Sequence, residues 1–183
     1  MTPKTTTHSD TTITELMIPA YSNLGGKIHG GVLLSLMDKV AYACATKHAG
    51  NYCVTVAVDT VDFLLPVEVG DLVSMMARVN YVGRTSLVIG IKVTAENVKK
   101  GMIKHTNTSY FTMVAKDDNN TPAEVPPLQL TSEMEVRRFY QSIFRKELKT
   151  YMKEQIIKNK KENNIDTILK NIEAERCVVS IVR

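Results

Sequence analysis

The 183-residue sequence lacks tryptophan and has no apolar run long enough to cross a membrane. No stretch approaches the roughly 18 consecutive apolar residues that a membrane-spanning helix requires. Residues 1–10 carry threonine, histidine and proline where a secretory signal peptide has an apolar core. We therefore expect a cytoplasmic protein with no membrane partner.

Cysteine is also scarce, with Cys44, Cys53 and Cys177 as the three examples. Their number is odd and their spacing matches no metal site. The first two lie among apolar residues, so reduced thiols are the expected state. The sequence thus indicates neither a disulfide framework nor a zinc site.

The net charge of +4 is modest, and most of the basic residues between Arg137 and Lys161 alternate with glutamates. Such mixed charge is typical of a solvated helical face. A nucleic-acid site would need basic residues interleaved with aromatic ones, or a known binding motif, and the sequence has neither. We expect no nucleic-acid partner.

The most informative stretch is residues 22–38, where four glycines are followed at once by apolar residues. The pattern predicts a loop that leads into a buried helix over residues 31–49, ended by Gly50. Apolar positions recur at spacings of three and four, which places them on one helical face. They are Val32, Leu33, Leu36, Met37, Val40 and Cys44.

One acid, Asp38, lies within this apolar helix. Burying an isolated carboxylate is unfavourable unless it is paired or used, so Asp38 is the leading chemical candidate. The amides of Gly30 and Gly31 lie where a helix start can stabilise an oxyanion. An alternative remains open, in which the glycines only allow close packing and Asp38 bonds a hydroxyl or Lys39.

Beyond residue 50 the apolar pattern changes to a period of two, which is typical of strands. A short strand is also expected over residues 14–18. Four long strands joined by short turns predict an antiparallel meander, with the early helix covering one face in an α+β fold. The long strands are expected over residues 52–63, 72–82, 86–97 and 102–115.

The C-terminal part has a helical pattern. Ser132 followed by Glu135 three positions later is typical of a helix start, and a long amphipathic helix is expected to follow. Residues 158–164 are a polar break before a second, shorter helix, and residues 177–182 are strand-like. Residues 128–183 therefore form a helical extension, whereas residues 1–12 are expected to be flexible.

The order of several separated blocks resembles the hotdog-fold acyl-CoA thioesterases, in particular the bacterial YciA type and the brain-type acyl-CoA hydrolases. The resemblance covers residues 13–127, which are expected to form the hotdog domain. The blocks are Asn23, Gly30-Gly31, Asp38, Val54-Thr55-Val56-Ala57-Val58, Phe63 to Pro66, Val69-Gly70-Asp71 and Val82-Gly83-Arg84-Thr85-Ser86.

This resemblance implies an enzyme that hydrolyses acyl-CoA to a free acid and CoA, without a metal or other cofactor. It implies Asp38 as the catalytic carboxylate and Asn23 as the residue that positions water or the carbonyl. Gly30 and Gly31 would then form the oxyanion site. Family members form homo-oligomers, in which the sites lie at dimer interfaces and dimers commonly assemble into hexamers as trimers of dimers.

The resemblance also implies that Arg84, Thr85 and Ser86 contact CoA. A basic side chain in a tight turn suits the CoA phosphates. His29 is interpreted as a loop residue that packs near the glycines or touches substrate, because no acid or serine forms a triad with it.

Two alternative functions stay open, namely a non-catalytic acyl-CoA-binding or regulatory hotdog protein and a hotdog hydratase or dehydratase. Asn23 and Asp38 argue against the first, and the second would usually require a paired histidine and acid. Asp38 could act as a general base or as a nucleophile. We favour the general base, because a neighbouring asparagine can hold a water.

Overall fold

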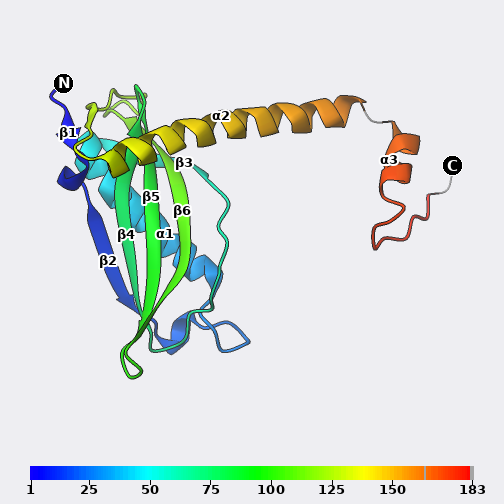
Figure 1. Cartoon of the computed structure of the whole chain (residues 1–183), viewed down its shortest axis with the longest axis horizontal. Coiled ribbons are helices and arrows are strands. Elements are labelled where there is room, and N and C mark those ends of the chain that lie inside the picture. Colours follow the sequence, from blue (N-terminus) through cyan, green and yellow to red (C-terminus); the bar gives the residue numbers. More distant parts are fainter. Residues whose placement is uncertain (163, 182–183) are drawn as a thin grey trace. The chain divides into compact units, whose positions relative to one another are not determined.

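The computed structural model describes residues 1–162 and 164–181. The chain divides into two units, Met1–Ser142 and Ile143–Arg183, and helix α2 contributes to both. In the first unit an antiparallel sheet curves around helix α1 (Figure 1). The elements of the first unit are β1 (Lys4–Thr5), η1 (Thr6–His8), β2 (Thr11–Leu16), η2 (Pro19–Tyr21), α1 (Gly30–Ala49), β3 (Tyr52–Val58), β4 (Leu72–Val82), β5 (Ser86–Asn97), β6 (Met102–Lys116), β7 (Leu128–Gln129) and the start of α2 (Glu133–Glu162).

Helix α1 occupies the concave side of the sheet, as the apolar pattern predicted. It begins at Gly30, one residue earlier than expected. It ends at Gly50, which adopts the left-handed conformation (φ 75°) and donates its N–H to Thr46 O. Its buried positions include the predicted apolar face except Val32, which is half-buried. They are Leu33, Leu36, Met37, Val40, Ala41, Cys44, Ala45, His48 and Ala49.

The sheet confirms the α+β hotdog fold, but the strand order is β2-β4-β5-β6-β3. The meander prediction is therefore correct only for β4, β5 and β6. Strand β3 pairs with β6 at the far edge, because the connection from Val58 to Leu72 is too long for a hairpin. That strand also ends at Val58, before the predicted end at residue 63.

The core lies between α1 and the inward positions of the long strands. Alternate residues of β4 and β5 are fully or almost fully buried, as the period of two requires. Burial of this apolar surface is the main force that holds the helix against the sheet. The inward residues are Val73, Met75, Ala77 and Val79 on β4, and Leu87, Ile89, Ile91 and Val93 on β5.

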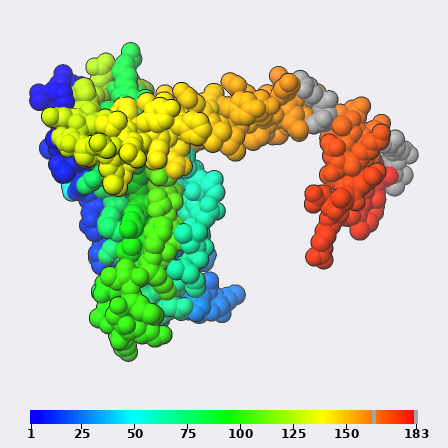
Figure 2. Space-filling view, in the orientation of Figure 1, coloured from blue at the N-terminus to red at the C-terminus, as the bar shows by residue number. Residues whose placement is uncertain are grey.

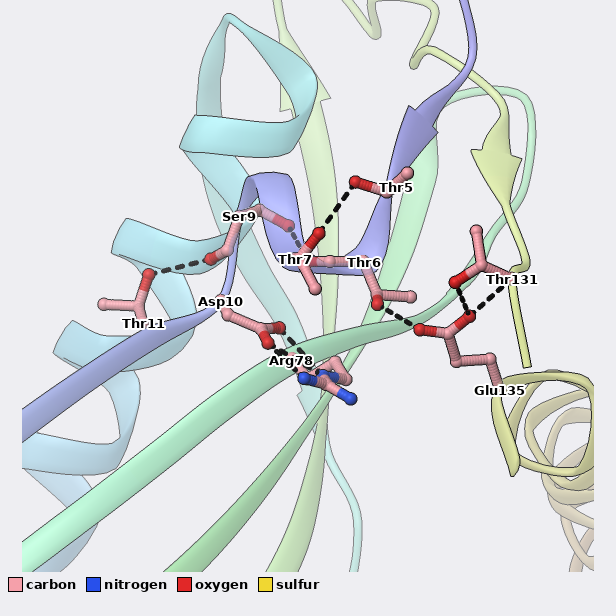
Figure 3. Close-up of polar contacts among 9 residues, drawn as sticks. All are labelled: Thr5, Thr6, Thr7, Ser9, Asp10, Thr11, Arg78, Thr131 and Glu135. Atoms are coloured by element: carbon pink, nitrogen blue, oxygen red, sulfur yellow. Dashed lines mark hydrogen bonds and ion pairs between the residues drawn. The ribbon is translucent and has the colours of Figure 1, made fainter. Parts of the chain in front are cut away.

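The N-terminal segment, expected to be flexible over residues 1–12, makes several polar contacts with the rest of the first unit. Lys4 donates to the carbonyl of His48 at 2.7 Å, near the end of α1 where carbonyls lack helical partners. Asp10 forms an ion pair with Arg78 (Figure 3), and Thr6 is buried. The polar composition of this segment suggested flexibility. In the structure its polar side chains pair with a helix-end carbonyl, with Arg78 and with Glu135.

Glu135 joins the N-terminal segment to α2, and the helix start predicted at Ser132 is confirmed. The Glu135 N–H donates to the Ser132 hydroxyl, while the carboxylate accepts from the Ser132 N–H. The same carboxylate accepts from the Thr6 hydroxyl at 2.5 Å and from the Thr131 N–H at 2.6 Å (Figure 3). These bonds, led by that from Thr6, lower the pKa of Glu135 to about 2.

The second unit contains the rest of α2 and helix α3 (Ile165–Asn171). Helix α2 continues to Glu162, through most of the expected polar break, because lysine and glutamate are good helix formers. Residues 177–181 form no strand, and residue 182 of that predicted segment lies outside the described residues. No helix within the described ranges combines the length and the apolar character that a bilayer crossing demands.

We predict that acid weakens the fold through Glu135. Because its pKa falls from 4.5 to about 2 on folding, its contribution is complete above pH 4.5 and is lost as the pH falls towards 2. Glu135→Gln should therefore lower the free energy of unfolding at neutral pH, and the variant should lose less stability than the wild type across that pH window. Denaturant unfolding at a series of pH values measures this.

Glu133→Gln provides the matched control. Its side chain is 92% exposed on the same helix turn, so we expect little change in the unfolding free energy. Equal stability of the Glu135→Gln variant and the wild type at neutral pH would contradict the role given to the Glu135 carboxylate.

Candidate active site

Asp38 and Thr55 form the polar pair nearest the middle of α1. The Thr55 hydroxyl donates to Asp38 Oδ1 at 2.6 Å and also lies 3.1 Å from Met113 Sδ. Thr55 belongs to β3, which is the edge strand of the sheet within the described residues. The sequence left open the alternative that Asp38 bonds a hydroxyl, and the structure shows such a bond to Oδ1 while the Asp38 residue stays exposed.

The expected burial of Asp38 is wrong for the single chain. Both Asp38 and Thr55 are exposed, and Asp38 makes no ion pair with any residue that the structure describes. The reason is that the sheet covers α1 on one side only. An exposed stripe at helical spacing, containing Gly31, Ser35, Asp38 and Tyr42, runs along the other side.

The start of α1 is capped by His29. Its Nδ1 accepts the Gly31 N–H at 2.9 Å, so one of the two amides expected to bind an oxyanion is already engaged. Gly30 lies against Phe63, because a β-carbon at Gly30 would be 3.3 Å from that ring. The structure thus brings His29, Gly30 and Gly31 together, with the histidine as a helix cap.

Asn23 organises the loop that precedes the helix. Its Oδ1 accepts from the N–H groups of Gly25 and Lys27 at 2.9 and 3.1 Å. Within the described ranges its Nδ2 makes no hydrogen bond to another residue. Asn23 therefore has its amide donor available for a water or a carbonyl oxygen.

Arg84, Thr85 and Ser86 lie at the other end of the sheet from the start of α1. Ser86 pairs with Val114 of β6, which pairs in turn with Val54, near the beginning of β3. Strand β3 starts directly after α1 ends, so the Arg84 turn lies near the C-terminal end of that helix. A 20-residue helix is roughly 30 Å long. One chain therefore does not bring Arg84 to Gly30.

Other reactive groups in the core are poorly suited to chemistry. Burial raises the pKa of the Cys44 thiol to about 12, and burial also raises the pKa of Cys53. Burial lowers the pKa of His48, whose Nε2 lies 3.0 Å from the carbonyl of Pro126. These groups stay uncharged within the core near neutral pH, which leaves Asp38 as the accessible carboxylate of α1.

Sequence reasoning missed Thr55 as a site residue. It lies in a block of alternating apolar residues, where a threonine is an ordinary strand residue. The sequence separation between Asp38 and Thr55 does not by itself indicate that the two residues are in contact. That contact can be recognised only when the position of β3 beside α1 is known.

Comparison with known proteins supports a common origin with thioesterases. A family model described as Thioesterase superfamily matches residues 25–102. Protein VdlD of Helicobacter pylori is 44% identical over 135 residues, which cover 74% of this chain and 77% of that protein. An uncharacterized acyl-CoA thioester hydrolase of Zymomonas mobilis is 36% identical over 63% of this chain and 78% of its own length.

Solved structures agree with these relatives. A hexameric acyl-CoA thioesterase superposes with a TM-score of 0.80 and 33% identity, and the alignment covers 83% of this chain and 97% of that one. An acyl-CoA hydrolase of Staphylococcus aureus, solved with butyryl coenzyme A and coenzyme A, has a TM-score of 0.75 and 28% identity. That alignment covers 87% of this chain and 99% of the other.

The Staphylococcus aureus hydrolase was also solved as three alanine variants, at an asparagine, an aspartate and a threonine. The spacing between these three residues is the same as that between Asn23, Asp38 and Thr55. Together with the curved sheet around α1 and the relatives described above, these matches show that the chain belongs to the hotdog-fold acyl-CoA thioesterases of the thioesterase superfamily.

Proposed function

We propose that the chain hydrolyses the thioester of acyl-CoA to a free acid and CoA at the Asp38–Thr55 pair. The observation that carries the proposal is the exposed carboxylate of Asp38, held through one oxygen by Thr55. The matching asparagine, aspartate and threonine of the Staphylococcus aureus hydrolase support it.

In the proposed reaction, the Thr55 hydroxyl fixes Oδ1 of Asp38, and Oδ2 accepts a proton from a water molecule. The water oxygen attacks the thioester carbonyl, and the carbonyl oxygen becomes an oxyanion. The carbon–sulfur bond then breaks, and the departing thiolate recovers the proton from Asp38. The products are one acid and one CoA thiol.

Donors for the oxyanion come from the start of α1 and from Asn23. Gly31 already donates to His29, so the Gly30 N–H and the Asn23 Nδ2 are the donors that we propose. Asp38 follows Gly30 by eight residues, or about 12 Å along the helix. One carbonyl cannot contact both groups of a single helix, which supports a site that two copies of the chain complete.

The exposed surface around Asp38 and Thr55 suits a homodimer. Tyr42, Val56 and Val58 are 40%, 55% and 43% exposed there, and β3 is the edge strand of the sheet in the part of the chain that the structure describes. A twofold axis beside α1 would place the start of one helix near the end of the other. The Arg84 turn of the second copy would then lie near Asn23 and Gly30.

We propose that the turn formed by Arg84, Thr85 and Ser86 of the second copy binds the phosphates of CoA. Its exposed guanidinium can form paired hydrogen bonds to phosphate oxygens. The carbonyl oxygens of Arg84 and Thr85 accept from Val125 and Ala115, both at 2.9 Å, so the turn is held in place. We further propose that three such dimers form a hexamer, as the name of one structural relative suggests.

We also propose that the reaction needs no cofactor beyond the CoA of the substrate and that it occurs in the cytoplasm. A relative from Rattus norvegicus named cytosolic acyl coenzyme A thioester hydrolase supports the location. It is 30% identical over 75% of this chain, which spans 36% of that longer protein.

The hydratase alternative is disfavoured by the histidines. His29 binds the Gly31 amide, His48 is buried beside Pro126, and His105 bonds Thr108. Within residues 1–162 and 164–181, no histidine forms a hydrogen bond or ion pair with an acid. A paired histidine and carboxylate, which that reaction usually requires, is therefore missing from the described chain.

We predict that Asp38→Asn lowers the turnover of acyl-CoA at least about a hundredfold, because the amide cannot accept the proton from water. The fold should be unaffected, since the side chain is exposed. Thiol release from acyl-CoA esters of increasing chain length measures the loss. Asp118→Asn is the control, being an exposed acid in the turn after β6. Undiminished hydrolysis by the Asp38→Asn variant would refute the assignment.

A second prediction concerns the hydroxyl of Thr55. Thr55→Val keeps the shape of the side chain but removes the donor to Asp38, and kcat should fall about tenfold. Thr55→Ser restores the donor and should recover most of the turnover. If the valine and serine variants were equally active, the hydrogen bond would have no role in catalysis.

A third prediction tests the phosphate contact. Arg84→Ala should raise KM for acyl-CoA about tenfold with little change in kcat, because it removes ground-state binding. With an acyl-pantetheine ester, which lacks the nucleotide phosphates, the variant and the wild type should have equal KM. Arg137→Ala, at an exposed arginine of α2, serves as the charge control. An equal rise in KM with both substrates would exclude phosphate binding by Arg84.

A further inference from the structure

A cavity of about 550 Å³ lies on the outer face of the sheet, on the side opposite α1 and next to the start of α2. Figure 2 shows the start of α2, in yellow, crossing the green strands of this face. Phe139 of α2 packs there on Tyr81 of β4, with ring centroids 4.9 Å apart. A cavity of this size suits a small molecule. The residues assigned to the proposed hydrolysis do not line it.

The cavity lies where one side chain is missing from the outer face. Arg78, Gly90 and Tyr110 are opposite one another on β4, β5 and β6, so their positions share this face. Because Gly90 has no side chain, the middle of the row is open. Lys92 follows Gly90 by two residues on β5 and therefore lies on the same face. All four residues line the cavity.

Asn80 brings an amide without a partner to this cavity. It is the extra residue of a β-bulge between Val79 and Tyr81, and a bulge redirects the side chain that it contains. The side chain lies over Gly90, where a β-carbon would clash with Nδ2 of the amide. Asn80 is only 8% exposed, yet its amide makes no hydrogen bond to any residue that the structure describes. A buried amide without a partner is unfavourable, so this one is suited to bond a group that enters the cavity.

Basic side chains outnumber acidic ones in the lining of the cavity. The guanidinium of Arg78 holds the carboxylate of Asp10, so the charges of that pair cancel (Figure 3). Lys92 and Arg138 also line the cavity. Within residues 1–162 and 164–181, neither of these two cations forms an ion pair or a side-chain hydrogen bond.

The charged groups beside the cavity do not change this balance. Lys47 donates to the hydroxyl of Thr11, which lines the cavity, at 3.1 Å. Glu135 lines a smaller neighbouring cavity, and its charge offsets that of Lys47. Glu133 and Arg137, on the same turn of α2, pair with each other at 3.8 Å. Two positive charges therefore remain without a counter-charge.

A phosphate monoester fits these groups better than a carboxylate does. It carries roughly two negative charges at neutral pH, which matches the two unpaired cations. The guanidinium of Arg138 can bond two phosphate oxygens, and the amide of Asn80 can donate to a third. A carboxylate supplies only one charge, and the carboxylate of Asp10 already occupies Arg78.

We propose that this cavity binds a small phosphate monoester, whose phosphate is held by Lys92, Arg138 and the amide of Asn80. The rest of the cavity holds the organic part of the ligand. This site is separate from the Arg84 turn proposed for the phosphates of CoA. The inference goes beyond the proposed hydrolysis, because the cavity lies on the face of the sheet opposite the helix that carries Asp38.

The test titrates glycerol phosphate into the full-length chain by isothermal titration calorimetry, with chloride keeping the ionic strength constant. We expect the wild type to bind one molecule per chain. The double variant Lys92→Gln with Arg138→Gln removes both unpaired cations, so its affinity should fall at least about tenfold. The variant Asn80→Ala removes the amide donor, and its affinity should fall about fivefold. Circular dichroism and denaturant unfolding check that each variant keeps its fold.

The double variant Lys99→Gln with Arg137→Gln is the matched control, because it removes the same charge at exposed residues that do not line the cavity. It should bind glycerol phosphate like the wild type. Arg84→Ala should also bind like the wild type, which separates this cavity from the turn proposed for CoA. Absence of thiol release by the wild type would refute the proposed hydrolysis and leave the binding result unaffected.

Four outcomes would overturn the phosphate site. The wild type could bind glycerol phosphate no better than it binds uncharged glycerol. The Lys92 and Arg138 double variant could bind as tightly as the matched control. Binding could be lost in the Arg84→Ala variant, which would assign it to the CoA turn. Finally, succinate could bind as tightly as glycerol phosphate, which would show that the cavity does not select a phosphate.

Discussion

The packing of α1 into the concave face of the sheet is the constraint on which the rest of the structure depends. Apolar residues on most sides of the helix force burial against β4, β5 and β6, and this burial fixes the direction of the helix. The side left uncovered carries Asp38. Edge strand β3 lies beside that side and brings Thr55 to the carboxylate. The same packing that stabilises the fold therefore presents Asp38 and Thr55, the proposed reaction site, at the surface.

The exposure of Asp38 and Thr55 favours association of two copies of the chain. A carboxylate open to water is a weak base for a thioester, whereas one enclosed by a second copy would act in a drier and less polarisable setting. The helix start and the Arg84 turn lie near opposite ends of α1 in one chain. The proposed twofold arrangement resolves both difficulties, because each copy would complete the site of the other.

Much of the fold could be predicted from local patterns. The change from helical to alternating spacing located α1 and the long strands, and Ser132 with Glu135 located the start of α2. Strand order could not be predicted, because the partner of β3 depends on contacts distant in sequence. The contacts of Thr55 and His29 could not be predicted either. The bond from Thr55 to Asp38 depends on where β3 lies beside α1, and the His29 cap depends on the orientation of the imidazole ring. Exposure of Asp38 was missed because a mostly apolar helix suggested burial on all sides.

The most direct measurement is a crystal structure of the Asp38→Asn variant with an uncleaved acyl-CoA ester. The account predicts the thioester carbonyl within one water molecule of the side chain at position 38, with that water about 3 Å from both. The Thr55 hydroxyl should contact the same side chain, and the CoA phosphates should lie on Arg84 of a different copy from the one whose Gly30 contacts the carbonyl. A thioester bound away from Asp38 and Thr55, or a site completed within one chain, would contradict the account.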